Sequence, residues 1–139
     1  MKRKRLLQLL HAAFADTQRP ARPLTTHRCW ECDEVDSVFG ARTWQEVAAE
    51  FPPYCHDTYS LLSDAAKAYF LPAYLIAALG ESSGGQGGSM ESELRFGWLE
   101  PGRFSHIQRL AVLTWATTYW RQAWGTEPPA EVVARWCPR

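Results

Sequence analysis

The chain has 139 residues, and its 15 basic side chains balance its 15 acidic ones. This length fits one domain with a buried core, and the zero net charge removes the general electrostatic reason to expect nucleic acid or an anionic membrane as a partner. No apolar run approaches the ~18–20 residues that span a bilayer. Four cysteines are too few for a disulfide scaffold of this size.

Residues 3–15 predict a first helix, because leucines and Phe14 recur on one helical face. The basic start and the Ala13–Ala15 stretch also resemble a signal peptide, but Gln8 and His11 interrupt its apolar part. We therefore expect an amphipathic helix in a cytoplasmic protein. Pro20 and Pro23 then break the chain into a loop.

Two shorter helices are expected next. The first runs from Cys29 to Phe39, with Trp30, Val35, Val38 and Phe39 as its apolar positions and Gly40 at its end. The second runs from residue 44 to about residue 50, because Thr43 and Glu46 have capping-box spacing.

The most hydrophobic segment predicts a central helix over residues 64–79, with Ser63 as its cap and Pro72 inside it as a source of a bend. The Gly/Ser-rich residues 80–89 predict a flexible loop. A short helix over residues 90–98 is expected to follow.

Ser105 can cap a long helix over residues 106–124, which Gly125 ends. Its expected apolar stripe consists of Ile107, Leu110, Ala111, Leu113, Thr114 and Thr117, and Trp115, Tyr119 and Trp120 widen this face. Pro129 suits the start of a last helix through Trp136. With no alternating strand pattern or hairpin signal, residues 1–139 predict a single all-α domain of six or seven helices, in which most of the seven tryptophans are core residues.

The stretch THRCWECDE contains two thiols, Cys29 and Cys32, at the spacing that structural zinc sites use. Tetrahedral zinc needs further ligands, for which His27, Cys55, His56 and Cys137 are candidates. Two other interpretations remain open. The thiols could form a redox pair at a helix start, or they could simply pack as small apolar side chains.

Four acids lie beside these cysteines: Glu31, Asp33, Glu34 and Asp36. Negative charge in a first helical turn is favoured by the helix dipole, which is a sufficient structural reason for them. They could also form an acidic surface that binds a basic partner.

The order HRCWECDE, TWQEV, LLSDAAKAYFLPAYLIAAL and RFSHIQRLAVLTW resembles a family of short bacterial proteins of unknown function. The resemblance covers roughly residues 10–124 and is most specific at His27, Cys29, Glu31 and Cys32, together with the YFLPA stretch of residues 69–73. It implies no activity. It implies that a metal would be held by His27, Cys29, Cys32 and His56 rather than by four cysteines.

A small, neutral, aromatic-rich helical protein without a recognisable active site predicts protein–protein binding rather than catalysis. Bacterial immunity proteins, which neutralise a toxin, have this profile, although the comparison rests on fold class and composition alone. The alternative is a small zinc protein, structural or catalytic, built on His27, Cys29, Cys32 and His56.

Overall fold

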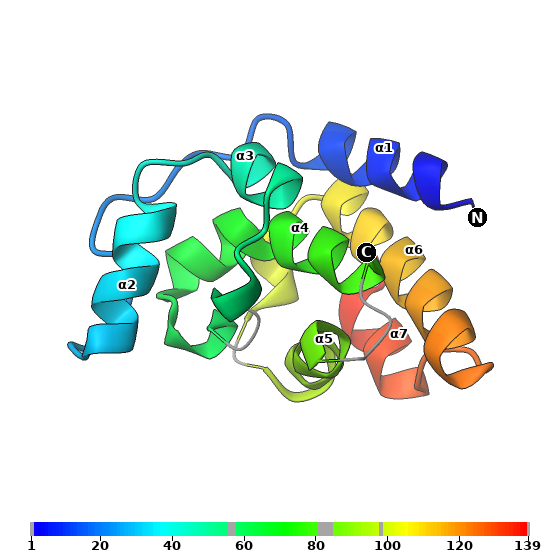
Figure 1. The fold of residues 1–139 in the computed structure, drawn as a ribbon. Helices are drawn as coiled ribbons and strands as arrows, with labels where there is room; N and C mark the ends of the chain where they lie inside the picture. Colours follow the sequence, from blue (N-terminus) through cyan, green and yellow to red (C-terminus); the bar gives the residue numbers. More distant parts are fainter. Residues whose placement is uncertain (1, 56–57, 81–84, 98, 139) are drawn as a thin grey trace. The chain divides into compact units, whose positions relative to one another are not determined.

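A computed structural model of the chain describes residues 2–55, 58–80, 85–97 and 99–138. These residues form seven α-helices and three short 3-10 helices, without a β-strand (Figure 1). The all-α fold expected from the sequence is confirmed. The α-helices are α1 (Arg3–Ala13), α2 (Trp30–Phe39), α3 (Trp44–Ala49), α4 (Asp64–Gly80), α5 (Gly85–Phe96), α6 (His106–Trp124) and α7 (Ala130–Trp136).

Local capping explains why most helix bounds agree with the sequence pattern. The Thr43 hydroxyl accepts the N–H of Glu46 at 3.2 Å, and the Glu46 carboxylate accepts the N–H of Thr43 at 2.9 Å, which closes the expected capping box. Ser105 and Gln108 form the same pair at the start of α6. Gly125 ends α6 in the left-handed conformation, with φ at 67°.

The expected loop over residues 80–89 is wrong in part. Gly80 is the last residue of α4, residues 81–84 lie outside the described residues, and residues 85–89 belong to α5. Glycine and serine are poor helix formers, and the long-range contacts of α5 lie toward its other end, at Glu91, Leu94 and Arg95. Arg135 donates to the carbonyls of Gly97 at 2.6 Å and Leu99 at 2.7 Å, which fixes the chain where α5 ends.

The chain divides into two compact units. One consists of Met1–Asp16 and Glu91–Arg139, and the other of Thr17–Met90. The backbone of α5 runs through the boundary between them. The expectation of a single domain stays a prediction.

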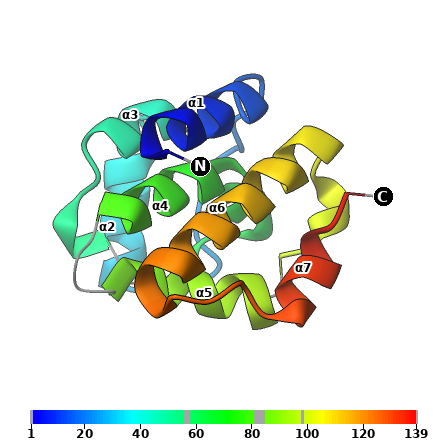
Figure 2. The same ribbon diagram turned by 90° about the vertical axis from the view of Figure 1, so that its right-hand side faces the viewer.

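In the unit formed by the two ends of the chain, α1 and α7 both pack on α6 (Figures 1 and 2). Leu6, Leu10 and Phe14 of α1 are buried, and the Phe14 ring meets the Phe104 ring edge-on at 6.2 Å between centroids. The apolar face of α1 is therefore the one that its sequence pattern predicts.

The buried face of α6 agrees with the expected one at Ala111, Trp115, Tyr119 and Trp120 and differs from it at Ile107 and Leu110. Ile107 and Leu110 are each 47% exposed. The residues that α6 buries are Ala111, Val112, Trp115, Ala116, Thr118, Tyr119 and Trp120. The larger aromatic area decides the orientation, since burying Trp115 and Trp120 removes more apolar surface from water than burying two aliphatic side chains.

In the unit of residues 17–90, α3 packs on α4, which is buried over most of its length. Tyr74 of α4 lies among three aromatic rings, those of Phe39, Phe51 and Tyr59, with centroids 4.8–6.0 Å away. Its hydroxyl pairs with the Thr58 hydroxyl at 2.8 Å. α4 continues as one helix through Pro72.

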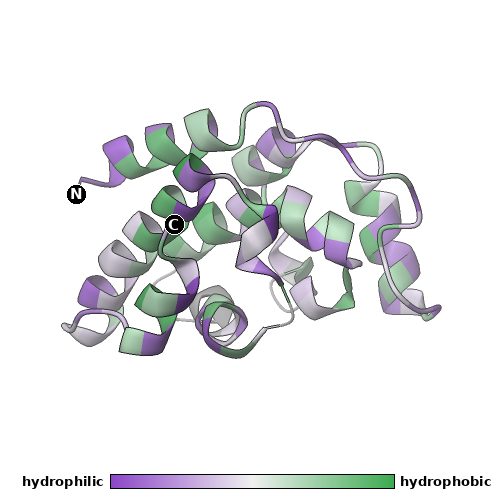
Figure 3. Ribbon diagram, turned by 180° about the vertical axis from the view of Figure 1, so that it is seen from behind, coloured by the Kyte–Doolittle hydropathy of each residue, from purple (hydrophilic) through white to green (hydrophobic). Residues whose placement is uncertain are grey.

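An extended segment after residue 17 contacts α2 through two arginines. Arg19 donates to the carbonyl of Phe39, the last residue of α2, and to those of Gly40 and Arg42, the latter at 2.6 Å. Arg22 forms an ion pair with Asp36 at 3.2 Å. Figure 3 shows hydrophobic and hydrophilic residues alternating along α2, and Val35 and Phe39 are on its buried side.

Trp30 is the exception to the expected apolar face of α2. Its side chain is 73% exposed. Among the other described tryptophans, Trp124 is 63% exposed and four are buried: Trp44, Trp115, Trp120 and Trp136. Most described tryptophans are therefore core residues, as expected, and Trp30 stands apart from them.

Candidate functional site

The segment before α2 is held in place on both sides. Ser63 donates its N–H to the Leu24 carbonyl at 2.8 Å, and Thr26 donates its N–H to the Leu61 carbonyl at 3.2 Å. Leu24 in turn donates its N–H to the Asp36 carboxylate at 3.0 Å. These bonds fix the backbone just before His27.

His27, Cys29 and Cys32 come together at the start of α2, with one potential ligand atom of each lying within 4.8 Å of the others. The Cys32 sulfur is 3.6 Å from His27 Nδ1 and 3.1 Å from the Cys29 sulfur. A tetrahedral zinc ion would separate a sulfur from a nitrogen by about 3.6 Å and two sulfurs by about 3.8 Å, given bonds of ~2.3 and ~2.05 Å. The Cys32–His27 separation already suits zinc, whereas the two thiols would have to part slightly and the most distant pair of ligand atoms, up to 4.8 Å apart, would have to move closer.

Burial differs across the cluster. His27 is exposed, Cys29 is half-buried and Cys32 is buried. Burial raises the pKa of the Cys32 thiol, and the hydrogen bond and charge of Cys29 raise it further. Cys29 is the N-cap of α2, where its sulfur accepts the N–H of Cys32 at 3.2 Å. The cluster therefore opens to solvent on its histidine side.

The remaining predicted ligands are placed differently. His56 lies outside the described residues. Neither Cys55 nor Cys137 belongs to the cluster. Burial raises the pKa of Cys55 to about 11, and the negative charge of Glu34 adds to this effect while Thr58 opposes it. Within the described residues, three protein ligands are available to one metal ion.

The four acids of α2 have two kinds of environment. Asp36 is half-buried and has partners within the chain, because its carboxylate accepts the N–H of Leu24 and pairs with Arg22. Glu31, Asp33 and Glu34 are exposed, and none of them has an ion pair or hydrogen-bonded carboxylate among the described residues. Three of the four acids therefore lie exposed on α2, and their role as a binding surface stays a prediction.

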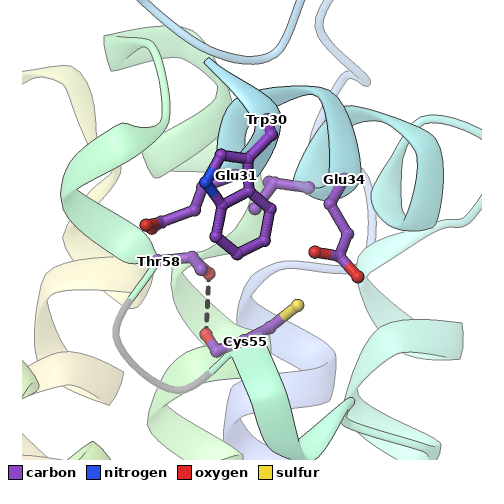
Figure 4. Close-up of a pocket in the computed structure, with 6 residues that line it drawn as sticks. Trp30, Glu31, Glu34, Cys55 and Thr58 are labelled. Atoms are coloured by element: carbon purple, nitrogen blue, oxygen red, sulfur yellow. Dashed lines mark hydrogen bonds between the residues drawn. The ribbon is translucent and has the colours of Figure 1, made fainter.

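A pocket adjoins α2, and it combines residues that sequence reasoning did not bring together. It is lined by Trp30, Glu31, Glu34, Val35, Cys55 and Thr58 (Figure 4). Cys55 and Thr58 lie 16 and 19 residues after Phe39, the last residue of α2. The Thr58 hydroxyl donates a hydrogen bond of 2.7 Å to the Cys55 carbonyl. No local sequence pattern predicts that Cys55 and Thr58 lie beside α2, because this arrangement depends on tertiary packing.

None of the described helices combines the length and the apolarity needed to cross a lipid bilayer. Comparison of the chain with protein-family models, with curated proteins and with solved structures gives no match. The cluster of His27, Cys29 and Cys32 agrees with the His-Cys motif on which the expected resemblance rests, while the family itself stays a prediction.

Proposed function

We propose that the chain binds one zinc ion through His27, Cys29 and Cys32. The observation that supports this is the convergence of one imidazole and two thiols within 4.8 Å. Thiolate and imidazole ligands suit zinc better than hard cations such as Mg²⁺ or Ca²⁺. The proposal assumes a cytoplasmic location, where free thiols persist as the ligand-competent form.

The fourth ligand decides what the zinc does. His56, the remaining member of the predicted ligand set, would close the site and make it structural. A water molecule in that position would leave the zinc open to a substrate. Zinc binding requires Cys32 as a thiolate. The positive charge of the ion would stabilise that thiolate against the burial that raises the pKa of the thiol.

Native mass spectrometry of protein purified without chelators tests this proposal. We expect one zinc per chain, and its loss in Cys29→Ser, Cys32→Ser and His27→Ala. Cys137→Ser is the matched control, because that thiol lies outside the cluster and should leave the zinc in place. If His56→Ala also loses zinc, His56 is the fourth ligand and the site is closed. A metal-free protein, or unchanged zinc in Cys32→Ser, would contradict the proposal.

A second candidate function is binding to a protein partner, of which the immunity-type neutralisation of a toxin is one form. It is favoured by Trp30, which is 73% exposed beside α2 carboxylates that form no ion pair with any described residue. Tryptophan is enriched among the residues that contribute most to protein interfaces.

Affinity capture from the native cell tests this second candidate. A specific partner should be retained by the unmodified chain and by Trp124→Ala, which removes an exposed tryptophan from the other unit. It should be lost with Trp30→Ala. If the partner is a toxin, the chain should suppress its activity in the same pattern, and equal retention by both variants would count against α2 as the binding surface.

A further inference from the structure

The pocket beside α2, hereafter the α2 pocket, lies entirely within the unit of residues 17–90. Its cavity volume is about 150 Å³. That volume is smaller than the ~300–1,000 Å³ of most small-molecule sites. The α2 pocket therefore suits a single side chain rather than a larger ligand.

The charge at the mouth of the α2 pocket is negative. Glu31 and Glu34 are three residues apart and so project from the same side of the helix. In Figure 4 their carboxylates lie on either side of the Trp30 ring. Neither carboxylate is paired with a described residue, in contrast to Asp36. Two such carboxylates repel each other, and a cation between them removes that repulsion.

The remaining walls are aromatic and uncharged. Trp30 presents an exposed indole ring over the pocket, and such a ring attracts an ammonium or guanidinium group placed over its face. Val35 and the Cys55 thiol supply apolar surface, and both are buried. The Thr58 hydroxyl is already bonded to the Cys55 carbonyl and to Tyr74, which holds this wall in place.

We propose that the α2 pocket receives a lysine or arginine side chain of a partner protein. An arginine or lysine has an aliphatic stem that can lie against Val35 and the indole ring, and a charged end that can reach both carboxylates. The charge complementarity identifies the occupant as basic. This inference rests on the partner-binding role proposed above and names the chemistry of that partner.

Nuclear magnetic resonance of the full-length protein tests the inference. The probe is a capped pentapeptide of glycines with one central arginine, and its control is the same peptide with citrulline, which keeps the shape and removes the charge. We expect the arginine peptide to shift the Trp30 indole N–H signal, assigned with Trp30→Phe, and the citrulline peptide to leave it in place. A spectrum that retains its dispersion shows that each variant remains folded.

Substitutions then distinguish binding in the α2 pocket from general attraction of the peptide to the acidic residues of α2. Glu34→Gln should weaken arginine-peptide binding by about two- to fivefold, as for one exposed ion pair. Trp30→Leu lacks the indole reporter, so its binding is followed through the backbone amide signals of α2, and it should be weaker by about two- to fivefold through the lost cation–π contact. Asp33→Asn is the matched control, because it removes one charge from the same helix without lining the pocket, and it should leave binding nearly unchanged.

Equal binding of the arginine and citrulline peptides, or equal effects of Asp33→Asn and Glu34→Gln, would overturn the inference. If a protein partner is captured through Trp30 while the two peptides behave alike, partner binding stands and the basic occupant is wrong. If the arginine peptide binds as expected but Trp30→Ala captures the same proteins as the unmodified chain, the assignment of the cation to a protein side chain is overturned.

Discussion

The distance between the Cys29 and Cys32 sulfurs is intermediate between that of a disulfide bond and that of two zinc-bound thiolates. The two sulfurs are 3.1 Å apart, whereas a disulfide bond measures about 2.05 Å and two thiolates on one tetrahedral zinc are about 3.8 Å apart. Side-chain movements of about 1 Å therefore reach either state. The same pair that binds zinc can lose two hydrogen atoms to an oxidant such as hydrogen peroxide, which is reduced to water as the disulfide forms.

We expect peroxide to form the Cys29–Cys32 disulfide in zinc-free protein and to form it much more slowly after zinc is added, because the metal occupies both sulfurs. Mass spectrometry after alkylation of free thiols measures this. Cys137→Ser should behave like the unmodified chain. Oxidation at the same rate with and without zinc would show that the two sulfurs do not bind the metal.

Cys55 should be the least reactive of the thiols near α2. Its pKa is raised to about 11, so the thiolate fraction near pH 7 is roughly one in ten thousand. We expect iodoacetamide to modify Cys55 slowly near neutral pH and about tenfold faster for each pH unit gained below 11. Quantitative mass spectrometry of Cys55 peptides measures the rate. A rate that does not change with pH would contradict the buried, neutral thiol.

At the scale of single elements, the capping box that begins α3 gives a pH-dependent prediction. The backbone N–H of Thr43, followed by its hydroxyl, lowers the pKa of Glu46. A lowered pKa in the folded state stabilises the fold above the ordinary value of 4.5, and that stabilisation is lost as the pH falls through the lowered value. Glu46→Gln should therefore be less stable than the unmodified chain near neutral pH and equally stable in strong acid, as measured by urea unfolding.

The hydroxyl half of the same box can be tested separately. Thr43→Ala removes the acceptor for the N–H of Glu46 and should lower the free energy of unfolding by about 1 kcal/mol. Thr43→Ser keeps the hydroxyl and should have little effect. Equal losses in the two variants would indicate that packing of the threonine methyl group, rather than the cap, stabilises α3.

Elements with local signals were predictable from the sequence, and those that depend on distant contacts were not. Thr43, Ser105 and Gly125 act on neighbours within four residues, so the ends of α3 and α6 followed from the sequence. Which apolar residues of α6 enter the core depends on packing against α1 and α7, far apart in the chain, so the exposure of Ile107 and Leu110 was not predictable. The site divides in the same way, because His27, Cys29 and Cys32 lie within six residues while the α2 pocket needs Thr58.

At the scale of the whole molecule, the expectation of one domain can be tested by unfolding. The backbone of α5 crosses the boundary between the two compact units without a break. We expect a single transition, which coincides when measured by tryptophan fluorescence and by circular dichroism. Chelation of zinc should lower the midpoint of that transition as a whole. Two separate transitions, of which only one responds to chelation, would show that the units unfold independently.

The division into units has a consequence for the order of events on the ribosome. The unit that contains α1 also needs α6, and more than ninety residues separate Phe14 from His106. At ~5–20 residues per second, α6 is synthesised several seconds after α1. During that interval Leu6, Leu10 and Phe14 have no helix α6 to cover them, and residues 17–90 are synthesised before α6 begins. The nascent chain therefore presents a basic, amphipathic helix to its surroundings for seconds before the fold can enclose its apolar face.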